Sequence, residues 1–228
     1  MKVMKFGGTS VGTPQRMKEV TNLVTKSGEP VFVVLSAMSG TTNSLVEISD
    51  YLYKKNPDGA NEVINRLEQK YDRHVEELYA SNETKATTRE FLRSEFDYLR
   101  SFTKELFTSF EEKSIVAQGE IISTNMVVNY MNEIGIKAVL INALDFMRTD
   151  KNSEPDPVYI KEKLKAILAE NEGAQVYLTQ GFICRNAYGE IDNLQRGGSD
   201  YTASLIGAAI NAEEIQIWTD IDGMHNND

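Results

Sequence analysis

Cysteine and histidine are almost absent from this sequence, which holds one cysteine and two histidines in 228 residues. A single thiol, that of Cys184, excludes an internal disulfide and a multi-cysteine metal site, and it fits a reducing compartment. His74 and His225 lie about 150 residues apart, and neither belongs to a His-Glu-x-x-His arrangement, so a zinc site is not expected. These scarcities predict a cytoplasmic protein without metal-ligating residues of its own.

Long apolar runs and an excess of positive charge are also lacking. No stretch approaches the roughly 20 apolar residues of a membrane-spanning helix. The segment from Met1 to Gly8 has no apolar run behind its positive charges, and so it is not a secretory signal. Lys and Arg number 24 against 34 Asp and Glu, a formal net charge of −10. Without a global positive field to attract a polyanion, we expect neither a nucleic-acid partner nor a membrane.

What is present is an ordinary globular composition, with 41% hydrophobic and 25% charged residues. Short apolar runs at 3–6 and 31–35 predict buried strands, and Thr13-Pro14 predicts a helix start between them. Strand-like runs resume at three places with helical stretches between them: strands at 137–142, 175–179 and 214–219, helices at 157–170 and 200–211. This alternation predicts an α/β fold with a mostly parallel sheet.

The segment from about 43 to 135 differs, because it is long, charged and helical in period, with breaks near Pro57 and near 81–88. It predicts a helical insertion of around 90 residues. Its aromatic stripe, which includes Phe91 and Phe96, indicates packing between helices more than a ligand groove.

Two familiar motifs fail and one nearly matches. No Gly-x-Gly pair occurs, and the P-loop spacing of Gly7 and Gly12 is followed by Thr13 and Pro14 where lysine and a hydroxyl residue belong. The segment 8–12 does match the Gly-x-Ser-x-Gly nucleophile elbow. A serine hydrolase with Ser10 and His225 is therefore an alternative, although no upstream segment offers the usual second oxyanion donor.

Phosphate chemistry is indicated by the first loop, where Lys5 precedes the pair Gly7-Gly8 ahead of a helix start. Glycines let the backbone approach closely, lysine supplies a movable charge, and free N–H groups at a helix start favour an anion. Three more segments support a site: 35–43 is small and hydroxyl-rich, 194–203 has an arginine and two glycines before a helix start, and 217–223 is a strand running into an acidic turn. Because ligands in open α/β sheets bind outside the carboxyl ends of the strands, the site is expected there.

Together these loops resemble the aspartokinase branch of the amino-acid kinase superfamily. Its patterns Lys-Phe-Gly-Gly-Thr-Ser-Val, Ser-Ala-x-Ala/Ser-Gly-x-Thr-Asn, Gly-Glu, Arg-Gly-Gly-Ser-Asp-x-Thr-Ala and Thr-Asp-Val-x-Gly occur in this order, the last with Ile221 for valine. The resemblance implies a three-layer sandwich with a mostly parallel sheet and ATP-dependent phosphorylation of the side-chain carboxylate of L-aspartate, with Mg²⁺ accompanying ATP. It also implies a homo-oligomer acting at the start of lysine, threonine and methionine biosynthesis.

Residue roles follow from the same resemblance. Residues that would act in catalysis are Lys5 and Asp200. Residues that would bind ATP are Lys5, Gly7, Gly8, Ser10, Thr219, Asp220 and His225, the last standing where many relatives carry tyrosine. Residues that would bind aspartate are Thr42, Glu120, Phe182, Arg196, Ser199 and Asp200. Arg196 suits the α-carboxylate and Glu120 the α-ammonium of a zwitterion. Taken singly, Thr42 and Ser199 also suit helix caps, and Glu120 suits a solvated helix position.

Family members continue beyond this length, with further nucleotide-binding residues including a lysine, then paired regulatory ACT domains, and in some a homoserine dehydrogenase. We therefore expect residues 1–228 to be a catalytic domain truncated at its C-terminus, with weak ATP affinity and no direct feedback inhibition by lysine or threonine. Kinases of the same fold acting on other acceptors, a binding-only module and the serine hydrolase are the alternatives.

Overall fold

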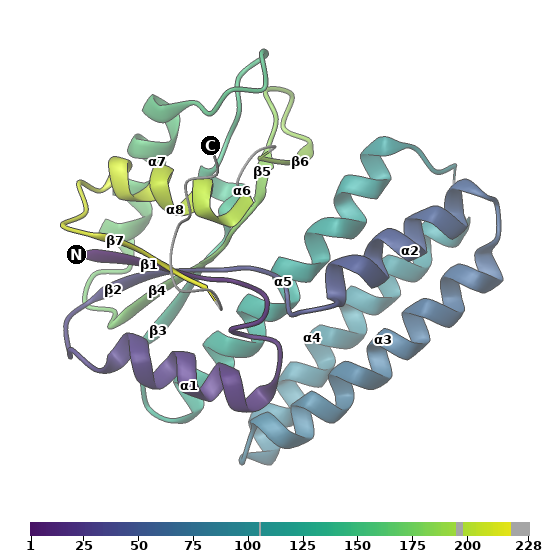
Figure 1. Cartoon of the computed structure of the whole chain (residues 1–228), viewed down its shortest axis with the longest axis horizontal. Coiled ribbons are helices and arrows are strands. Elements are labelled where there is room, and N and C mark those ends of the chain that lie inside the picture. The colour runs from purple at the N-terminus through teal and green to yellow at the C-terminus, as the bar shows by residue number, and fades with distance from the viewer. Residues whose placement is uncertain (105, 195–197, 220–228) are drawn as a thin grey trace, which may run out of the picture.

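A computed structural model describes residues 1–104, 106–194 and 198–219. Its centre is a five-stranded sheet in the order β3-β4-β2-β1-β7, in which every neighbouring pair is parallel (Figure 1). The strands are β1 (Lys2–Phe6), β2 (Val31–Leu35), β3 (Ala138–Ile141), β4 (Val176–Gln180) and β7 (Ile215–Trp218). All five were expected from the short apolar runs, and β2 has the predicted bounds.

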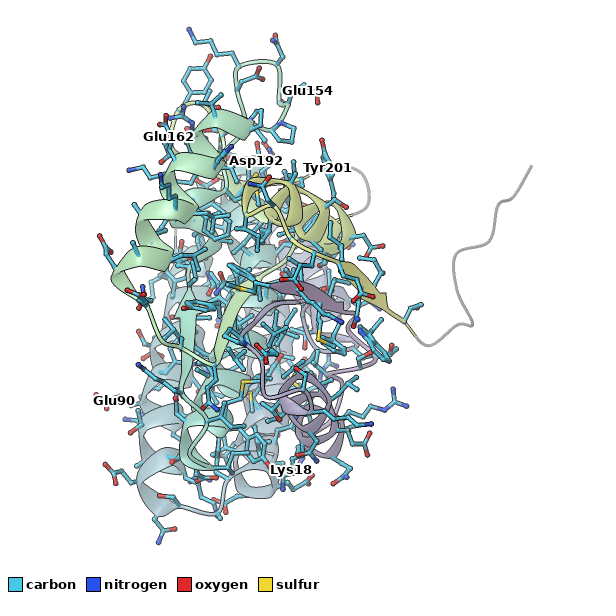
Figure 2. All side chains as sticks on the ribbon, turned by 90° about the vertical axis from the view of Figure 1, so that its left-hand side faces the viewer. Lys18, Glu90, Glu154, Glu162, Asp192 and Tyr201 are labelled. Atoms are coloured by element: carbon cyan, nitrogen blue, oxygen red, sulfur yellow. The ribbon has the colours of Figure 1, made fainter. Side chains whose placement is uncertain are left out.

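Helices cover both faces of the sheet, as Figures 1 and 2 show. α1 (Pro14–Thr25) and α5 (Ser109–Glu133) share one apolar core with the side chains of one face. α7 (Pro157–Glu170) and α8 (Gly198–Ala209) share a second core with those of the other face. Residues alternate between faces along a strand, so a strand buried on both sides reads as continuously apolar. The expected three-layer α/β sandwich is confirmed.

Local signals explain where the helices begin. The Thr13 side chain accepts a hydrogen bond from Arg16 N and Pro14 takes the first helical position, as the sequence predicted for α1. In the helical region, Asn56 caps α3 (Pro57–Leu78) and Ser81 caps α4 (Asn82–Ser101). Both caps fall at the breaks expected from the sequence.

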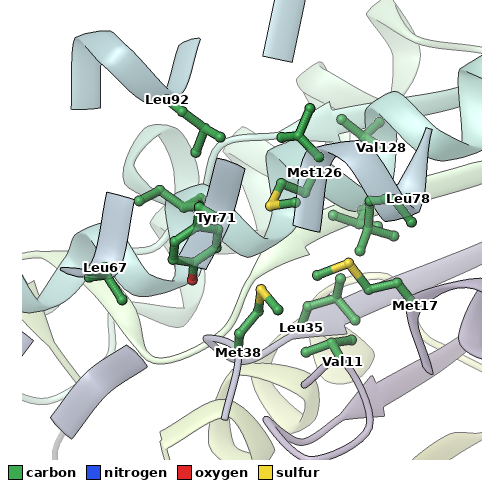
Figure 3. Packing of buried hydrophobic residues seen from close by; sticks show 14 of the residues in the cluster. Val11, Met17, Leu35, Met38, Leu67, Tyr71, Leu78, Leu92, Met126 and Val128 are labelled. Carbon is green, nitrogen blue, oxygen red and sulfur yellow. The ribbon is translucent and has the colours of Figure 1, made fainter. Parts of the chain in front are cut away.

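The remaining helical elements are α2 (Thr41–Tyr53) and the short 3-10 helix η1 (Phe102–Lys104). They pack with α3, α4 and α5 around apolar side chains, among them Leu67, Tyr71 and Leu92 (Figure 3). Phe96 is wholly buried there, so this part of the aromatic stripe serves core packing. α5 is buried on nearly all sides because it lies between the sheet and these helices.

Three short elements were not predicted from the sequence. They are α6 (Ala143–Phe146) and the two strands of a hairpin, β5 (Ile183–Arg185) and β6 (Ile191–Asn193). Elements of three or four residues are too short to show a period.

The outer surface is charged, and Figure 2 shows Glu90, Glu154 and Glu162 pointing outward. No helix in the described ranges is long and apolar enough to cross a membrane.

Candidate active site

The carboxyl ends of four strands meet at one edge of the sheet. Phe6, the last residue of β1, is opposite Leu35 of β2 and Trp218 of β7, and Leu35 is opposite Gln180 of β4. The loops that begin at Gly7, Ser36, Gly181 and Thr219 therefore start side by side. This is the edge where the sequence predicted the site.

Lys5 and Asp200 form an ion pair at this edge. Lys5 Nζ lies 2.7 Å from Asp200 Oδ1, with the lysine side chain 12% exposed and the aspartate side chain 52% exposed. Lys5 reaches Asp200 because Val3, two residues earlier, faces the core shared with α8, and side chains alternate along a strand. The structure thus brings together the two residues predicted to act in catalysis.

The adjacent glycines Gly7 and Gly8 of the first loop differ in their surroundings. A Cβ atom on Gly8 would lie 2.7 Å from the carbonyl oxygen of Ala37, whereas one on Gly7 would meet only Lys5 Nζ, at 3.7 Å. Gly8 O also accepts a hydrogen bond of 3.1 Å from Ser39 N. Close packing of two loops therefore demands glycine at position 8.

We expect Gly8→Ala to lower the free energy of unfolding by about 1–3 kcal/mol, since overpacking of this kind costs about that much. The measurement is urea denaturation. Gly7→Ala is the matched control and should change stability little. Equal stability of the two variants would contradict the close packing of the loops.

Glu120 is the most unusual acid of the site. It lies on α5 and is only 5% exposed. Its Oε1 accepts a hydrogen bond of 3.3 Å from Ala37 N, while Oε2 has no hydrogen-bond partner in the described part of the chain. Burial raises the pKa of Glu120 to about 7, against the lowering effect of the Ala37 N–H. The alternative interpretation of Glu120, as a solvated residue on the surface of a helix, is therefore wrong.

Close helix packing brings Glu120 to this loop. Gly119, the residue before Glu120, lies so close to the loop that a Cβ atom added to Gly119 would be 2.8 Å from the Cβ of Ala37. A buried carboxylate oxygen without a partner is costly unless a donor or a cation reaches it. The arrangement therefore suits a positively charged group of a ligand.

Hydroxyl groups form hydrogen bonds around Ser36, the neighbour of the residue whose N–H reaches Glu120. Ser36 Oγ donates to Ser199 Oγ at 2.8 Å, and Ser123 Oγ donates to the Ser36 carbonyl oxygen at 2.8 Å. Gly181 permits this approach, because a Cβ there would lie 2.5 Å from Ser199 Cβ. Ser36 was not singled out from the sequence, although a hydroxyl directly after a buried strand is the signal that points to it.

Two of the cap assignments considered from sequence are wrong. α8 begins at Gly198, so Ser199 lies inside its first turn. Thr42 is an exposed residue of the first turn of α2, and the cap position there is Gly40. Neither side chain is therefore occupied in capping a helix.

Phe182 adopts a left-handed backbone conformation, with φ of 70°. Its N–H donates to Thr202 Oγ1 at 2.9 Å, which fixes the turn against α8. The ring lies beside Gly198, at 3.5 Å from the point where a Cβ would stand. Phe182 is thus held next to Ser199, the neighbour of Gly198, as its predicted role requires.

Ser10 and Thr219 come from distant parts of the chain yet line the same hollow of about 370 Å³, together with Arg16 and the stacked rings of Phe6 and Trp218. Arg16 donates to the Thr9 carbonyl oxygen at 2.7 Å. Arg16 was not predicted from the sequence, because a single arginine on a helix belongs to no recognisable motif.

The Lys5 ammonium group and the tight turn at Gly7 and Gly8 are suitable for a phosphate group. Three residues predicted to bind ligands, Arg196, Asp220 and His225, lie outside the described residues. Within the described ranges no group of three or more His, Cys, Asp or Glu is arranged to hold a metal ion.

The fold and the site define an α/β protein with a cation, Lys5, and a buried carboxylate, Glu120, at the carboxyl ends of a parallel sheet, where open α/β sheets bind small ligands. The pattern described as the Amino acid kinase family matches residues 1–228. The chain belongs to this family.

Several relatives are similar over nearly all of this chain. Aspartokinase 1, chloroplastic, of Arabidopsis thaliana is 34% identical, over 97% of this chain and 40% of its own length. The lysine-sensitive aspartokinase 3 of Escherichia coli K12 is 31% identical, over 99% of this chain and 50% of its own. The chain thus spans about half the length, or less, of these relatives.

The crystal structure of E. coli aspartokinase III in complex with aspartate and ADP is also similar. It has a TM-score of 0.84 at 29% sequence identity, and the match covers 98% of this chain and 50% of that one.

Proposed function

We propose that this chain carries the catalytic site of an aspartate kinase, which transfers the γ-phosphoryl group of ATP to the side-chain carboxylate of L-aspartate. The product is 4-phospho-L-aspartate, the first intermediate toward lysine, threonine and methionine. The observation that carries the proposal is that two opposite charges occur in one site: the Lys5 cation, which is paired with Asp200, and the buried Glu120, whose Oε2 has no hydrogen-bond partner among the described residues. The similarity to aspartokinases supports the choice of acceptor.

The chemistry requires little from a general base. The acceptor carboxylate has an ordinary pKa near 4 and is ionised at neutral pH. One of its oxygens attacks the γ-phosphorus, the bond from that phosphorus to the bridging oxygen breaks, and ADP leaves with the electron pair. The barrier lies in charge repulsion and alignment, so Lys5 and the amides of Gly7 and Gly8 act by stabilising negative charge. Mg²⁺ bound to ATP supplies further positive charge.

The amino-acid end of the site follows from charge. Glu120 Oε2 accepts a hydrogen bond from the α-ammonium group of aspartate, which supplies a donor that Oε2 lacks among the described residues. Ser199 and Thr42 add hydroxyl contacts, and Phe182 bounds the pocket. Arg196 binds the α-carboxylate in a bidentate pair. At the nucleotide end, Ser10, Thr219, Asp220 and His225 contact ATP.

Hydroxylamine trapping tests the proposal, because it converts an acyl phosphate to a coloured hydroxamate. With ATP and Mg²⁺, the chain should yield hydroxamate from L-aspartate and not from glutamate or acetylglutamate. Product with another acceptor would assign a different amino-acid kinase. Aspartate binding by calorimetry without hydroxamate would assign a binding-only module, and labelling of Ser10 by a fluorophosphonate would assign a hydrolase.

Asp200 orients Lys5 and the substrate instead of removing a proton. We expect Asp200→Asn to lower kcat about tenfold to a hundredfold, the scale of a misoriented charge, without moving the acidic limb of the kcat profile. The measurement is the hydroxamate rate between pH 5.5 and 9. A shift of that limb by a full pH unit would contradict the orienting role.

We further propose that the protein works in the cytosol as a homo-oligomer. The single, buried Cys184 is consistent with a reducing compartment, and assembly rests on the family resemblance. Light scattering of the purified chain tests the oligomeric state.

A further inference from the structure

One loop, residues 36–40 between β2 and α2, contacts three separate parts of the site, and Thr41 directly after it is the first residue of α2. Ser36 Oγ donates to Ser199, Ala37 N donates to Glu120, and Ser39 N donates to Gly8 O. The loop thus joins the first glycine turn, the buried acid and the start of α8. Its conformation sets how these three groups face one another.

Two consecutive residues of α3 hold this loop from the helical region. Lys70 Nζ donates to the Ser39 carbonyl oxygen at 3.2 Å. The Tyr71 hydroxyl forms a hydrogen bond of 2.8 Å with Thr41 Oγ1. Figure 3 shows the Tyr71 ring inside the apolar cluster, with its hydroxyl toward the side where Met38 of the loop lies. The contact therefore runs from the helical core directly into the site.

The bond between Tyr71 and Thr41 is sealed from water. Both residues are 0% exposed, and the Tyr71 ring packs 6.0 Å from that of Phe96. Burial raises the pKa of Tyr71, with a smaller raising effect from the charge of Glu120, so the phenol keeps its proton. A buried hydroxyl without a hydrogen-bond partner is destabilising, because it has lost its contacts with water. The bond to Tyr71 therefore stabilises the position of Thr41 at the end of the loop.

We propose that Tyr71, assisted by Lys70, is a positioning residue through which α3 fixes the aspartate end of the site. The inference rests on the proposed function, since it assigns the held loop to the acceptor subsite. Neither residue touches the substrate. They act by keeping Ala37 N on Glu120 and Ser36 on Ser199.

The test compares two tyrosines of the same region. Tyr71→Phe removes only the hydroxyl that reaches Thr41. Tyr79→Phe is the matched control, because Tyr79 is also buried and its hydroxyl donates to the Met126 carbonyl oxygen on α5, away from the loop. Both variants lose one buried hydrogen bond and should lose similar stability.

We expect Tyr71→Phe to raise KM for aspartate about tenfold, the scale of one lost buried hydrogen bond, with kcat within about twofold. Tyr79→Phe should leave both constants unchanged. Thr41→Val should reproduce the effect, and the double variant should be no worse than either single one, as expected for residues that act through one contact. Equal KM values in the two tyrosine variants, or additive effects in the double variant, would overturn the proposal.

Hydrogen exchange separates this inference from the proposed function. Amide hydrogen exchange is measured without ligands in three proteins: the wild type, Tyr71→Phe and Tyr79→Phe. The peptide that reports on the loop spans residues 36–42. Faster exchange in Tyr71→Phe alone supports the hold on the loop, and equal exchange in both variants overturns it. A wild-type chain that forms no aspartyl hydroxamate would defeat the proposed function, and the exchange result would still decide whether α3 holds the loop.

Discussion

Lys5→Met should lower kcat about a hundredfold to a thousandfold, the range for loss of one preorganised charge-stabilising group. Lys5 is the cation at the carboxyl end of β1, its side chain is mostly buried, and it forms an ion pair with Asp200. Methionine keeps the length of the side chain and removes its charge, so packing is preserved and the developing negative charge has no counterpart. The measurement is the hydroxamate rate at saturating aspartate and ATP.

Lys2→Met is the control for this variant. Lys2 lies on the same strand and pairs with Glu214 at 2.8 Å, but its side chain is 51% exposed and stands at the amino end of β1. Its removal should leave kcat unchanged, because the site is at the opposite end of the strand. A Lys5→Met enzyme that keeps a tenth of wild-type turnover would contradict the role given to Lys5.

Glu120 should make aspartate binding depend on pH. Burial raises the pKa of Glu120 to about 7, so the group is largely protonated at pH 6 and largely ionised at pH 8. The α-ammonium group of aspartate needs the ionised form. KM for aspartate should therefore fall up to about tenfold per pH unit between pH 5.5 and 7, and level off above pH 7.5. The measurement is KM across this range.

Glu120→Gln should raise KM for aspartate about a hundredfold at pH 8, since removing one partner of a buried charge pair costs about 2–5 kcal/mol. The pH dependence of KM should disappear with it. Retention of the wild-type KM profile in this variant would show that Glu120 does not bind the ammonium group.

The same substitution should stabilise the unliganded protein at high pH. The folded-state pKa lies above the ordinary value of 4.5, so the folded state holds its proton more tightly than the unfolded state does. The contribution of Glu120 to the free energy of unfolding therefore falls as pH rises from 4.5 to 7, by about 3 kcal/mol in total. Glutamine does not ionise, so Glu120→Gln should exceed the wild type in stability at pH 8 and match it near pH 4.5.

Glu112→Gln is the control, because Glu112 lies in the first turn of the same helix and accepts a hydrogen bond from the Tyr53 hydroxyl at the surface. It should change neither KM for aspartate nor the slope of stability with pH. Urea denaturation at pH 4.5, 6 and 8 measures the three proteins side by side. A parallel pH slope in wild type and Glu120→Gln would contradict the burial of an ionisable carboxyl.

The formal charge of −10 and the proposed nucleotide are compatible because recognition is local. Acidic residues such as Glu90 and Glu162 lie on outer helices, while Lys5 stands at the sheet edge with backbone amides beside it. Net charge reports on long-range attraction to polyanions, and it carries no information on one enclosed site.

Much of the fold could be predicted because its signals are local. The apolar runs of β1 and β2, the Thr13-Pro14 start of α1 and the caps at Asn56 and Ser81 each depend on a few adjacent residues. The hairpin of β5 and β6 could not be predicted, because three-residue strands form through contacts with the rest of the molecule. Lys113 of α5, for example, pairs with Asp192 of β6 at 2.7 Å.

The sequence by itself determined that this is an α/β protein with phosphate-binding character, and it indicated which residues belong to the proposed site. Only the tertiary structure decided their states. Glu120 is an ordinary glutamate in the sequence, and burial beside Ala37 raises its pKa to about 7 and leaves its Oε2 without a hydrogen-bond partner among the residues that the structure describes. Gly8 is required by the nearness of Ala37, and the Tyr71 hydroxyl reaches Thr41 across 30 residues. Burial and close approach are properties of segments distant in sequence, so they exist only once the chain has folded.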